Sequence, residues 1–359
     1  MSTTWQPDRY AALADAFGGL VRADRADTVL VHAEATVALE AVATSLAAPG
    51  TTALNLVSSP YGTLFGDWLA HGGTTVIPVT AADGRAIDVA EVRSALRAEP
   101  GIGVLAVVHA EVITGVVNPI DEIVALAREH GAIVVTDAVA AVGGLALNPD
   151  VDITVLSPQK ALGGLPGLAA VTVSPAGWAA LAKRADPRAP ESVLSLTGLR
   201  RRWLDTGRVT IPGIPSTLDL SAAEETLEAV AREGVDARIA RHVLARDAVR
   251  AGIRASGLRL WVAEDAQANS LATTVAVPPG IPAERLAARA GSLGAPWTEG
   301  IGRTHGKLLR LDHYGARARF DAVLAGVLAL ARAAGELGVA TDPGAAAAAA
   351  AAAWAAGVL

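Results

Sequence analysis

Two apolar segments, each followed at once by polar residues, stand in the middle of the chain: AIVVTDAVAAVGG at residues 132–144 and ITVLSPQKALGGLPG at residues 153–167. Unbroken runs of Ile, Val and Leu are typical of strands covered on both faces of a sheet. Asp137 ends the first run, and Lys160 closely follows the second. In an open α/β sheet, ligands bind beyond the carboxyl ends of the strands. We therefore expect both residues to face the same cleft.

Strand and helix patterns alternate around this stretch, which predicts an α/β fold with a mostly parallel, mixed sheet. We expect strands at residues 28–31, 52–57, 74–79, 103–109, 132–136, 153–156 and 168–173. A long helix at 216–256, broken at Gly234, leads into a smaller α+β region with strands at 258–262, 271–277 and 308–311. The predicted parts are a large domain (1–225), a small C-terminal domain (226–337) and a peripheral alanine-rich tail (338–359).

The composition limits the possible chemistry. The 359 residues carry 30 basic and 36 acidic side chains without a basic block, which argues against nucleic acid or membrane partners. The absence of cysteine excludes disulfides and thiolate chemistry, and we expect no metal site. No secretory or membrane-spanning segment is visible, so we expect a cytoplasmic protein.

Lysine occurs only at positions 160, 183 and 307. Lys183 is flanked by charge and fits a solvated side chain, and Lys307 precedes a strand. Lys160 lies in an uncharged loop rich in Gly and Pro, where burial would lower its pKa and favour the free amine of Schiff-base chemistry. Pyridoxal chemistry needs such a lysine, and an acid that keeps the ring nitrogen protonated. From the residues alone, Asp137 also fits a helix cap or a solvated loop acid.

The motifs TDAVAAVGG (136–144), SPQK (157–160) and GLPG (164–167), in this order, resemble the class V aminotransferases of the alanine–glyoxylate aminotransferase group. The resemblance implies a fold-type I pyridoxal-phosphate enzyme with a large cofactor domain, a smaller C-terminal domain and active sites shared in a homodimer. It also implies transfer of an amino group from an amino acid or pyridoxamine to a small 2-oxo acid such as pyruvate or glyoxylate, through a Schiff base at Lys160.

The resemblance also assigns roles to single residues. Lys160 is the expected catalytic residue. Arg310 is expected to hold the substrate carboxylate, although a surface ion pair stays open, and Arg303 is a candidate second arginine beside Ile301. The expected cofactor-binding residues are Asp137 at the ring nitrogen, Tyr61 stacked on the ring, Thr210 at the neighbouring subunit's phosphate site, Glu34, Ala35 and Gln159.

Glu34 is the informative departure from the family pattern. Further stretches, including HAE (32–34) and NPID (118–121), resemble a branch of the family that acts on pyridoxamine. A carboxylate at a helix N-terminus would repel a phosphate dianion but could accept a hydrogen bond from a 5′-hydroxyl group. Two expectations stay open: unphosphorylated pyridoxal or pyridoxamine is bound, or Glu34 turns away and pyridoxal 5′-phosphate is bound.

Other departures leave the reaction open. The family's N-terminal arm is shortened here, Val112 replaces a hydroxyl residue, and Ile301 replaces an arginine. The alternatives to transamination are a pyridoxal-dependent lyase, racemase or aldolase on the same scaffold, and a non-catalytic protein that binds vitamin B6.

Overall fold

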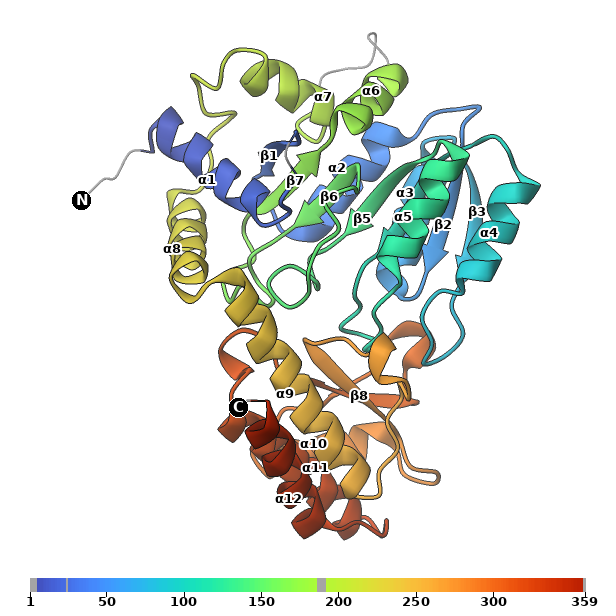
Figure 1. The fold of residues 1–359 in the computed structure, drawn as a ribbon, viewed down its shortest axis with the longest axis vertical. Helices are drawn as coiled ribbons and strands as arrows, with labels where there is room; N and C mark the ends of the chain where they lie inside the picture. The colour runs from blue at the N-terminus through green and yellow to red at the C-terminus, as the bar shows by residue number, and fades with distance from the viewer. Residues whose placement is uncertain (1–4, 24, 186–191, 358–359) are drawn as a thin grey trace.

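A seven-stranded sheet forms the centre of the larger domain of this computed structural model, which describes residues 5–23, 25–185 and 192–357 (Figure 1). Its strands are β1 (Asp27–Val31), β2 (Thr52–Val57), β3 (Thr75–Thr80), β4 (Ile102–Val108), β5 (Ile133–Asp137), β6 (Ile153–Leu156) and β7 (Ala169–Val173), in the order β1-β7-β6-β5-β4-β2-β3. Only β7 pairs antiparallel with both of its neighbours. The other six strands therefore end at the same edge of the sheet.

Helices cover both faces of this sheet, which confirms the predicted α/β architecture. They are α1 (Pro7–Gly19), α2 (Ala35–Leu46), α3 (Pro60–His71), α4 (Val89–Ala98), α5 (Ile120–His130), α6 (Pro175–Arg184), α7 (Leu196–Leu199) and α8 (Thr217–Glu233). Alternate residues of β4 face opposite layers: Val104 and Ala106 pack with α2 and α3, whereas Leu105 and Val107 pack with α4 and α5. Both faces are apolar, as the unbroken strand runs predict.

The smaller domain consists of a three-stranded antiparallel sheet and four helices. The strands are β8 (Ala272–Ala276), β9 (Thr298–Glu299) and β10 (Leu308–Asp312), and the helices are α9 (Val235–Ala255), α10 (Ala283–Ser292), α11 (Phe320–Glu336) and α12 (Pro343–Ala356). The predicted helix break is confirmed at Gly234, whose φ is 85°. The predicted strand at 258–262 is wrong, because only Leu260 forms a bridge, to Val275.

The packing changes between the two domains within helix α9. The larger hydrophobic core extends through α8 to Val235, and the smaller core begins at Ala245. This change lies beyond the limit predicted at residue 225. None of the helices among the described residues is long and apolar enough to cross a membrane.

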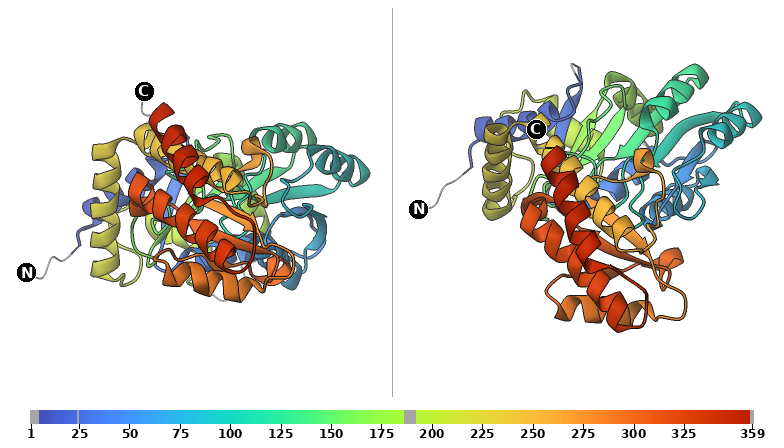
Figure 2. Two further views of the ribbon diagram at one scale, coloured as in Figure 1. Left: turned by 90° about the horizontal axis from the view of Figure 1, so that it is seen from below. Right: turned by 60° about the horizontal axis from the view of Figure 1, so that its bottom comes forward.

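The alanine-rich C-terminal segment, which we expected to be peripheral, forms α12 and packs along α9 and α11 (Figure 2). Ala346 belongs to the small-domain core, and Ala350 is also fully buried. The close approach depends on Gly252 of α9, since a Cβ atom there would lie 3.1 Å from the Ala346 carbonyl oxygen and 3.2 Å from Ala350 Cβ. The segment is therefore part of the domain.

Substitution Gly252→Ala should destabilise the protein by about 1–3 kcal/mol, because the added methyl group must displace packed neighbours. Urea unfolding should show a lower midpoint than for the unchanged protein. The control is Gly291→Ala in α10, where a Cβ meets nothing within 4 Å and the higher helix propensity of alanine should leave stability equal or greater. An undiminished midpoint for Gly252→Ala would contradict this close packing.

Candidate active site

A cavity of about 180 Å³ lies at the edge where the six strands end. Its lining includes Lys160 from the β6–β7 loop, Asp137 from the end of β5, Tyr61 from the first turn of α3, and Glu34 at the start of α2. A cavity of about 150 Å³ is known to hold a benzene ring. The space therefore suits one substituted aromatic ring.

Asp137 opens onto this cavity but is otherwise enclosed by protein. Burial raises the pKa of its carboxyl group to about 6, while a hydrogen bond from the Val139 N–H and the charge of Lys160 act in the opposite direction. The Val139 bond, 2.9 Å to Oδ1, fixes the side chain in a tight turn. The same carboxylate thus closes a local turn and faces the ligand space.

Lys160 is half-buried in the cavity wall, as its apolar loop predicts. Burial lowers the pKa of its ammonium group, an effect that Asp312 opposes and Arg310 reinforces. Its Nζ atom lies 5.6 Å from the centre of the Tyr314 ring. The other lysines lie elsewhere: Lys183 is exposed on α6, and Lys307 pairs with Asp83 at 3.1 Å. Lys160 is the lysine with a lowered affinity for its proton.

Glu34 caps the N-terminus of α2 and faces the cavity. Its Oε2 atom accepts a hydrogen bond from the Thr36 N–H at 2.8 Å, and its Oε1 atom accepts one from Gln159 Nε2 at 3.1 Å. The next residue, Ala35, is buried and also lines the cavity. A carboxylate therefore occupies the place where exposed helix N–H groups would otherwise receive an anion.

Glu111 is a buried acid that was not among the predicted site residues. It lines the cavity, and its Oε1 atom accepts a hydrogen bond from Ser58 Oγ at 3.1 Å, which in turn accepts one from Asn118 Nδ2 at 2.8 Å. Burial raises the pKa of Glu111 to about 8, so this side chain holds a proton at neutral pH. Its position just after β4, like that of Asp137 after β5, was the signal available in the sequence.

The small domain contributes two charged residues from β10. Arg310 and Asp312 stand two residues apart, so they project from the same face of the strand. Arg310 Nη2 donates to Asp312 Oδ2 at 3.1 Å, and both side chains are largely buried. Their charges influence the pKa of Lys160 across the domain boundary. Arg310 thus forms an ion pair, but a largely buried one whose charges act on Lys160 and not one on the outer surface.

Helix α9 forms hydrogen bonds to the loop that follows Lys160 and to the loop that follows Asp312. Arg238 Nη1 donates to the carbonyl oxygens of Ala161 and Leu162 at 2.9 and 2.7 Å, directly after Lys160. His242 Nε2 accepts from the Gly315 N–H at 3.0 Å, shortly after Asp312. Gly315, with φ of 58°, lets its loop approach the Lys160 backbone, since a Cβ would lie 3.3 Å from the Lys160 carbonyl oxygen.

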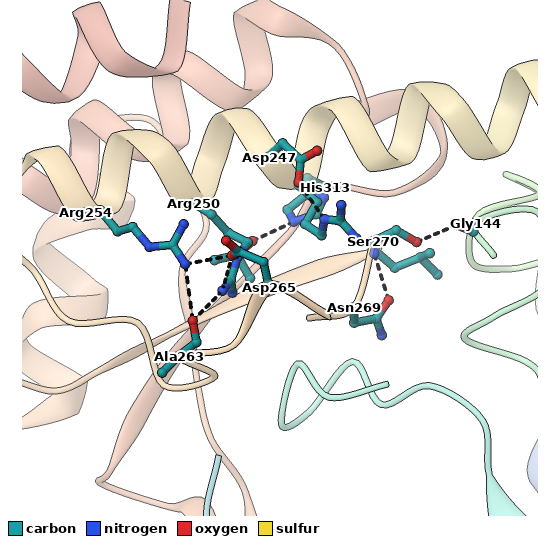
Figure 3. A network of polar contacts seen from close by, with 12 residues as sticks. Gly144, Asp247, Arg250, Arg254, Ala263, Asp265, Asn269, Ser270 and His313 are labelled. Carbon is teal, nitrogen blue, oxygen red and sulfur yellow. Dashed lines mark hydrogen bonds and ion pairs between the residues drawn. The ribbon is translucent and has the colours of Figure 1, made fainter. Parts of the chain in front are cut away.

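A network of polar contacts links helix α9, the segment before β8 and the residue after β10 of the small domain (Figure 3). Arg250 and Arg254 of α9 converge on Asp265, and Ser270 Oγ donates to the Gly144 carbonyl oxygen of the large domain at 2.6 Å (Figure 3). The buried His313 ring contacts Thr273 Oγ1 at 2.9 Å. The His313 and Ser270 contacts fix the segments directly beside β10 and β8, the strands that carry Arg310 and its neighbours.

Three predicted site residues do not line the cavity: Arg310, described above, and the more distant Thr210 and Arg303. Thr210 is exposed on the loop before α8. Arg303 donates to the Ala81 carbonyl oxygen at 3.1 Å and lies 3.5 Å from Asp83, in a separate groove that Ile301 also lines. Within one chain the structure therefore gathers Lys160 with the five other cavity residues Asp137, Tyr61, Glu34, Ala35 and Gln159.

Comparisons with known proteins identify the family. The family model for aminotransferase class-V matches residues 8–287. Pyridoxamine–pyruvate transaminase of Mesorhizobium japonicum is 37% identical over 84% of this chain and 77% of its own length. The crystal structure of pyridoxamine–pyruvate aminotransferase from Mesorhizobium loti covers 98% of this chain and 89% of its own, with a TM-score of 0.89 and 34% identity.

An alanine–glyoxylate aminotransferase from Nostoc is similar in structure at a TM-score of 0.82 and 25% identity, over 92% of this chain and 89% of its own. These similarities confirm the fold-type I architecture and the branch of the family that the sequence indicates. With a family match across most of its length and a lysine and an aspartate in one strand-end cavity, the chain belongs to the class V aminotransferases, which work with vitamin B6.

Proposed function

We propose that the protein transfers an amino group from pyridoxamine or an amino acid to a small 2-oxo acid, with pyruvate as the first candidate acceptor. The placement of Lys160 and Asp137 in one cavity carries this proposal, because they are the nucleophile and the acid that pyridoxal chemistry requires. The similarity to a pyridoxamine–pyruvate transaminase supports the choice of both substrates.

The residues present fit a pyridoxal group. Asp137 is a deeply placed carboxylate suited to a protonated ring nitrogen, Tyr61 supplies an aromatic face, and Lys160 supplies an amine for the aldehyde. When bound, this group supplies an electron sink for the electron pair left when a proton leaves the neighbouring carbon atom. Glu111 is held neutral by burial and adds no negative charge beside Asp137.

Lys160 would transfer the proton, and Arg310 would bind the substrate carboxylate. The lowered pKa of Lys160 favours a neutral Nζ atom, which can accept a proton from the carbon next to the transferred nitrogen and return it one position away. The guanidinium of Arg310 would hold the substrate carboxylate in two parallel hydrogen bonds. The apolar wall formed by Val112 and Ala140 limits water around the reacting atoms.

We propose that the bound vitamer lacks the phosphate group. Glu34 caps α2 with its carboxylate facing the cavity and hydrogen-bonded by Gln159, so it has not turned away. A phosphate dianion there would meet a negative charge in place of free N–H groups. A 5′-hydroxyl group could instead donate a hydrogen bond to Glu34.

We also propose a homodimer in which Thr210 of one chain approaches the site of the other. Apolar side chains cluster along the loop that carries Thr210 and the start of α8: Val209 is 65% exposed, Leu218 81% and Ile214 fully. Exposed apolar patches of this kind are typical of association surfaces. A cytoplasmic location stays a prediction.

Lys160→Ala should abolish formation of alanine from pyruvate and pyridoxamine, since no other lysine lines the cavity. Borohydride reduction of the unchanged protein with pyridoxal should fix a mass on Lys160, located by peptide mass spectrometry. Lys183→Ala, an exposed lysine, is the control and should retain both results. An adduct on Lys183 or Lys307, or products of ammonia release or carbon–carbon cleavage, would contradict the proposal.

Glu34→Ala should shift the preference from pyridoxal toward pyridoxal 5′-phosphate by at least about tenfold in the ratio of dissociation constants, because like charges no longer meet at the α2 N-terminus. Absorbance titration of the purified protein with each vitamer measures the ratio. Glu40→Ala on the same helix, whose acid does not line the cavity, is the matched control. Tighter binding of the phosphate form by the unchanged protein would refute the assignment.

Ile214→Asp should shift the protein from dimer to monomer in sedimentation velocity, because a charge would be buried in an apolar contact. Leu64→Asp, a partly exposed apolar residue of α3 outside this loop, serves as the comparison and should remain dimeric. A monomeric unchanged protein, or equal behaviour of the two variants, would remove this surface as the dimer contact.

A further inference from the structure

Asp312 forms an ion pair with the residue that the proposed function assigns to the substrate carboxylate. Arg310 Nε lies 2.8 Å from Asp312 Oδ1, and Arg310 Nη2 donates to Asp312 Oδ2 at 3.1 Å. The side chains retain 22% and 16% of their exposure. The Nε/Nη2 edge of the guanidinium, one of the two edges that can bind a carboxylate through two hydrogen bonds, is therefore already in contact with one.

The pair is close but poorly aligned. Among the described residues, Arg310 Nε and Asp312 Oδ1 are buried atoms without a hydrogen bond of acceptable geometry, although they lie 2.8 Å apart. Both side chains leave one strand at positions i and i+2, which restricts the angle at which the two planar groups can meet. A mobile carboxylate can instead approach in the plane of the guanidinium and accept two parallel hydrogen bonds.

We infer that Asp312 is a specificity-determining residue that competes with the substrate carboxylate for Arg310. A 2-oxo acid binds by taking the place of Asp312 on the guanidinium, so its affinity is the difference between a well-aligned and a poorly aligned ion pair. A substrate without a carboxylate, such as pyridoxamine, does not need this exchange. Asp312 thereby lowers the affinity of the site for carboxylates in general and leaves the affinity for the amine donor unchanged.

The charges around the site support this assignment. Asp312, Glu34 and Asp137 all raise the pKa of Lys160, whereas Arg310 lowers it, so acids outnumber the one guanidinium on this side of the lysine. Tyr314, in the loop directly after β10, has its ring centre 5.6 Å from Lys160 Nζ. A carboxylate that enters this region without an available arginine meets a surplus of negative charge.

The test compares pyruvate binding by Asp312→Asn with binding by the unchanged full-length protein, with and without vitamin B6. Titration calorimetry should show a pyruvate dissociation constant about tenfold lower in the variant, because a neutral amide competes less strongly than a carboxylate. The affinity for pyruvamide, which lacks the charge, should not change. In the loaded enzyme the KM for pyruvate should fall while the KM for pyridoxamine stays constant.

Asp321→Asn is the matched control, because Arg319 and Asp321 form a second pair at the same i, i+2 spacing on the exposed start of α11. It should leave pyruvate binding unchanged. Weaker or unchanged binding by Asp312→Asn would overturn the inference, and weaker binding would identify Asp312 as a group that orients Arg310. Asp312→Ser provides the same comparison if the asparagine variant does not fold.

This inference rests on the proposed function, but the two can fail separately. Calorimetry on the protein without B6 tests the carboxylate site alone, whereas the Lys160 adduct tests the cofactor site. An adduct without the Asp312 effect removes only the inference. Tighter pyruvate binding without an adduct leaves the Asp312 competition and removes the proposed reaction.

Discussion

Removal of acidic side chains from water is the constraint on which this site depends. Asp137 ends β5, Glu111 lies shortly after the end of the neighbouring strand β4, and each carboxyl group is costly to ionise where it lies. The two carboxyl groups differ in whether neighbouring groups offset this cost. Asp137 receives a backbone hydrogen bond and the nearby charge of Lys160, whereas Glu111 keeps its proton. The pair thus contributes about one negative charge, which matches one protonated ring nitrogen.

The two domains contribute different kinds of residue to the site because their sheets differ in topology. Parallel strands deliver their carboxyl ends to one edge, so the large domain can gather an acid, a lysine and an aromatic ring from distant parts of the sequence. The small antiparallel sheet offers instead one strand face, on which Arg310 and Asp312 stand side by side. Under the proposed function, the large domain would carry the bond-making chemistry and the small domain would bind the substrate carboxylate.

The sequence predicted the strand-end pair because the signal is local: an apolar run followed by Asp137, and a rare lysine in an uncharged loop. It did not single out Glu111, although the same rule applies there. The Arg310–Asp312 pair is local to β10, but its nearness to Lys160 could not be predicted, because it depends on how the two domains pack against each other. Helix α12 was missed because uniform alanine shows no amphipathic pattern, and its packing relies on Gly252. Residues 258–262 run beside β8 with few regular bonds, which a strand pattern cannot reveal.

Helix α9 holds both the loop after Lys160 and the loop after Asp312, through Arg238 and His242. The two loops therefore cannot separate without breaking buried hydrogen bonds. The two domains also share the exposed ion pairs of Asp83 with Arg303 and Lys307. Such surface pairs are weak and are screened by dissolved salt. Dissolved salt therefore weakens these exposed pairs, while the buried hydrogen bonds that set the spacing of the Lys160 and Asp312 loops are not screened.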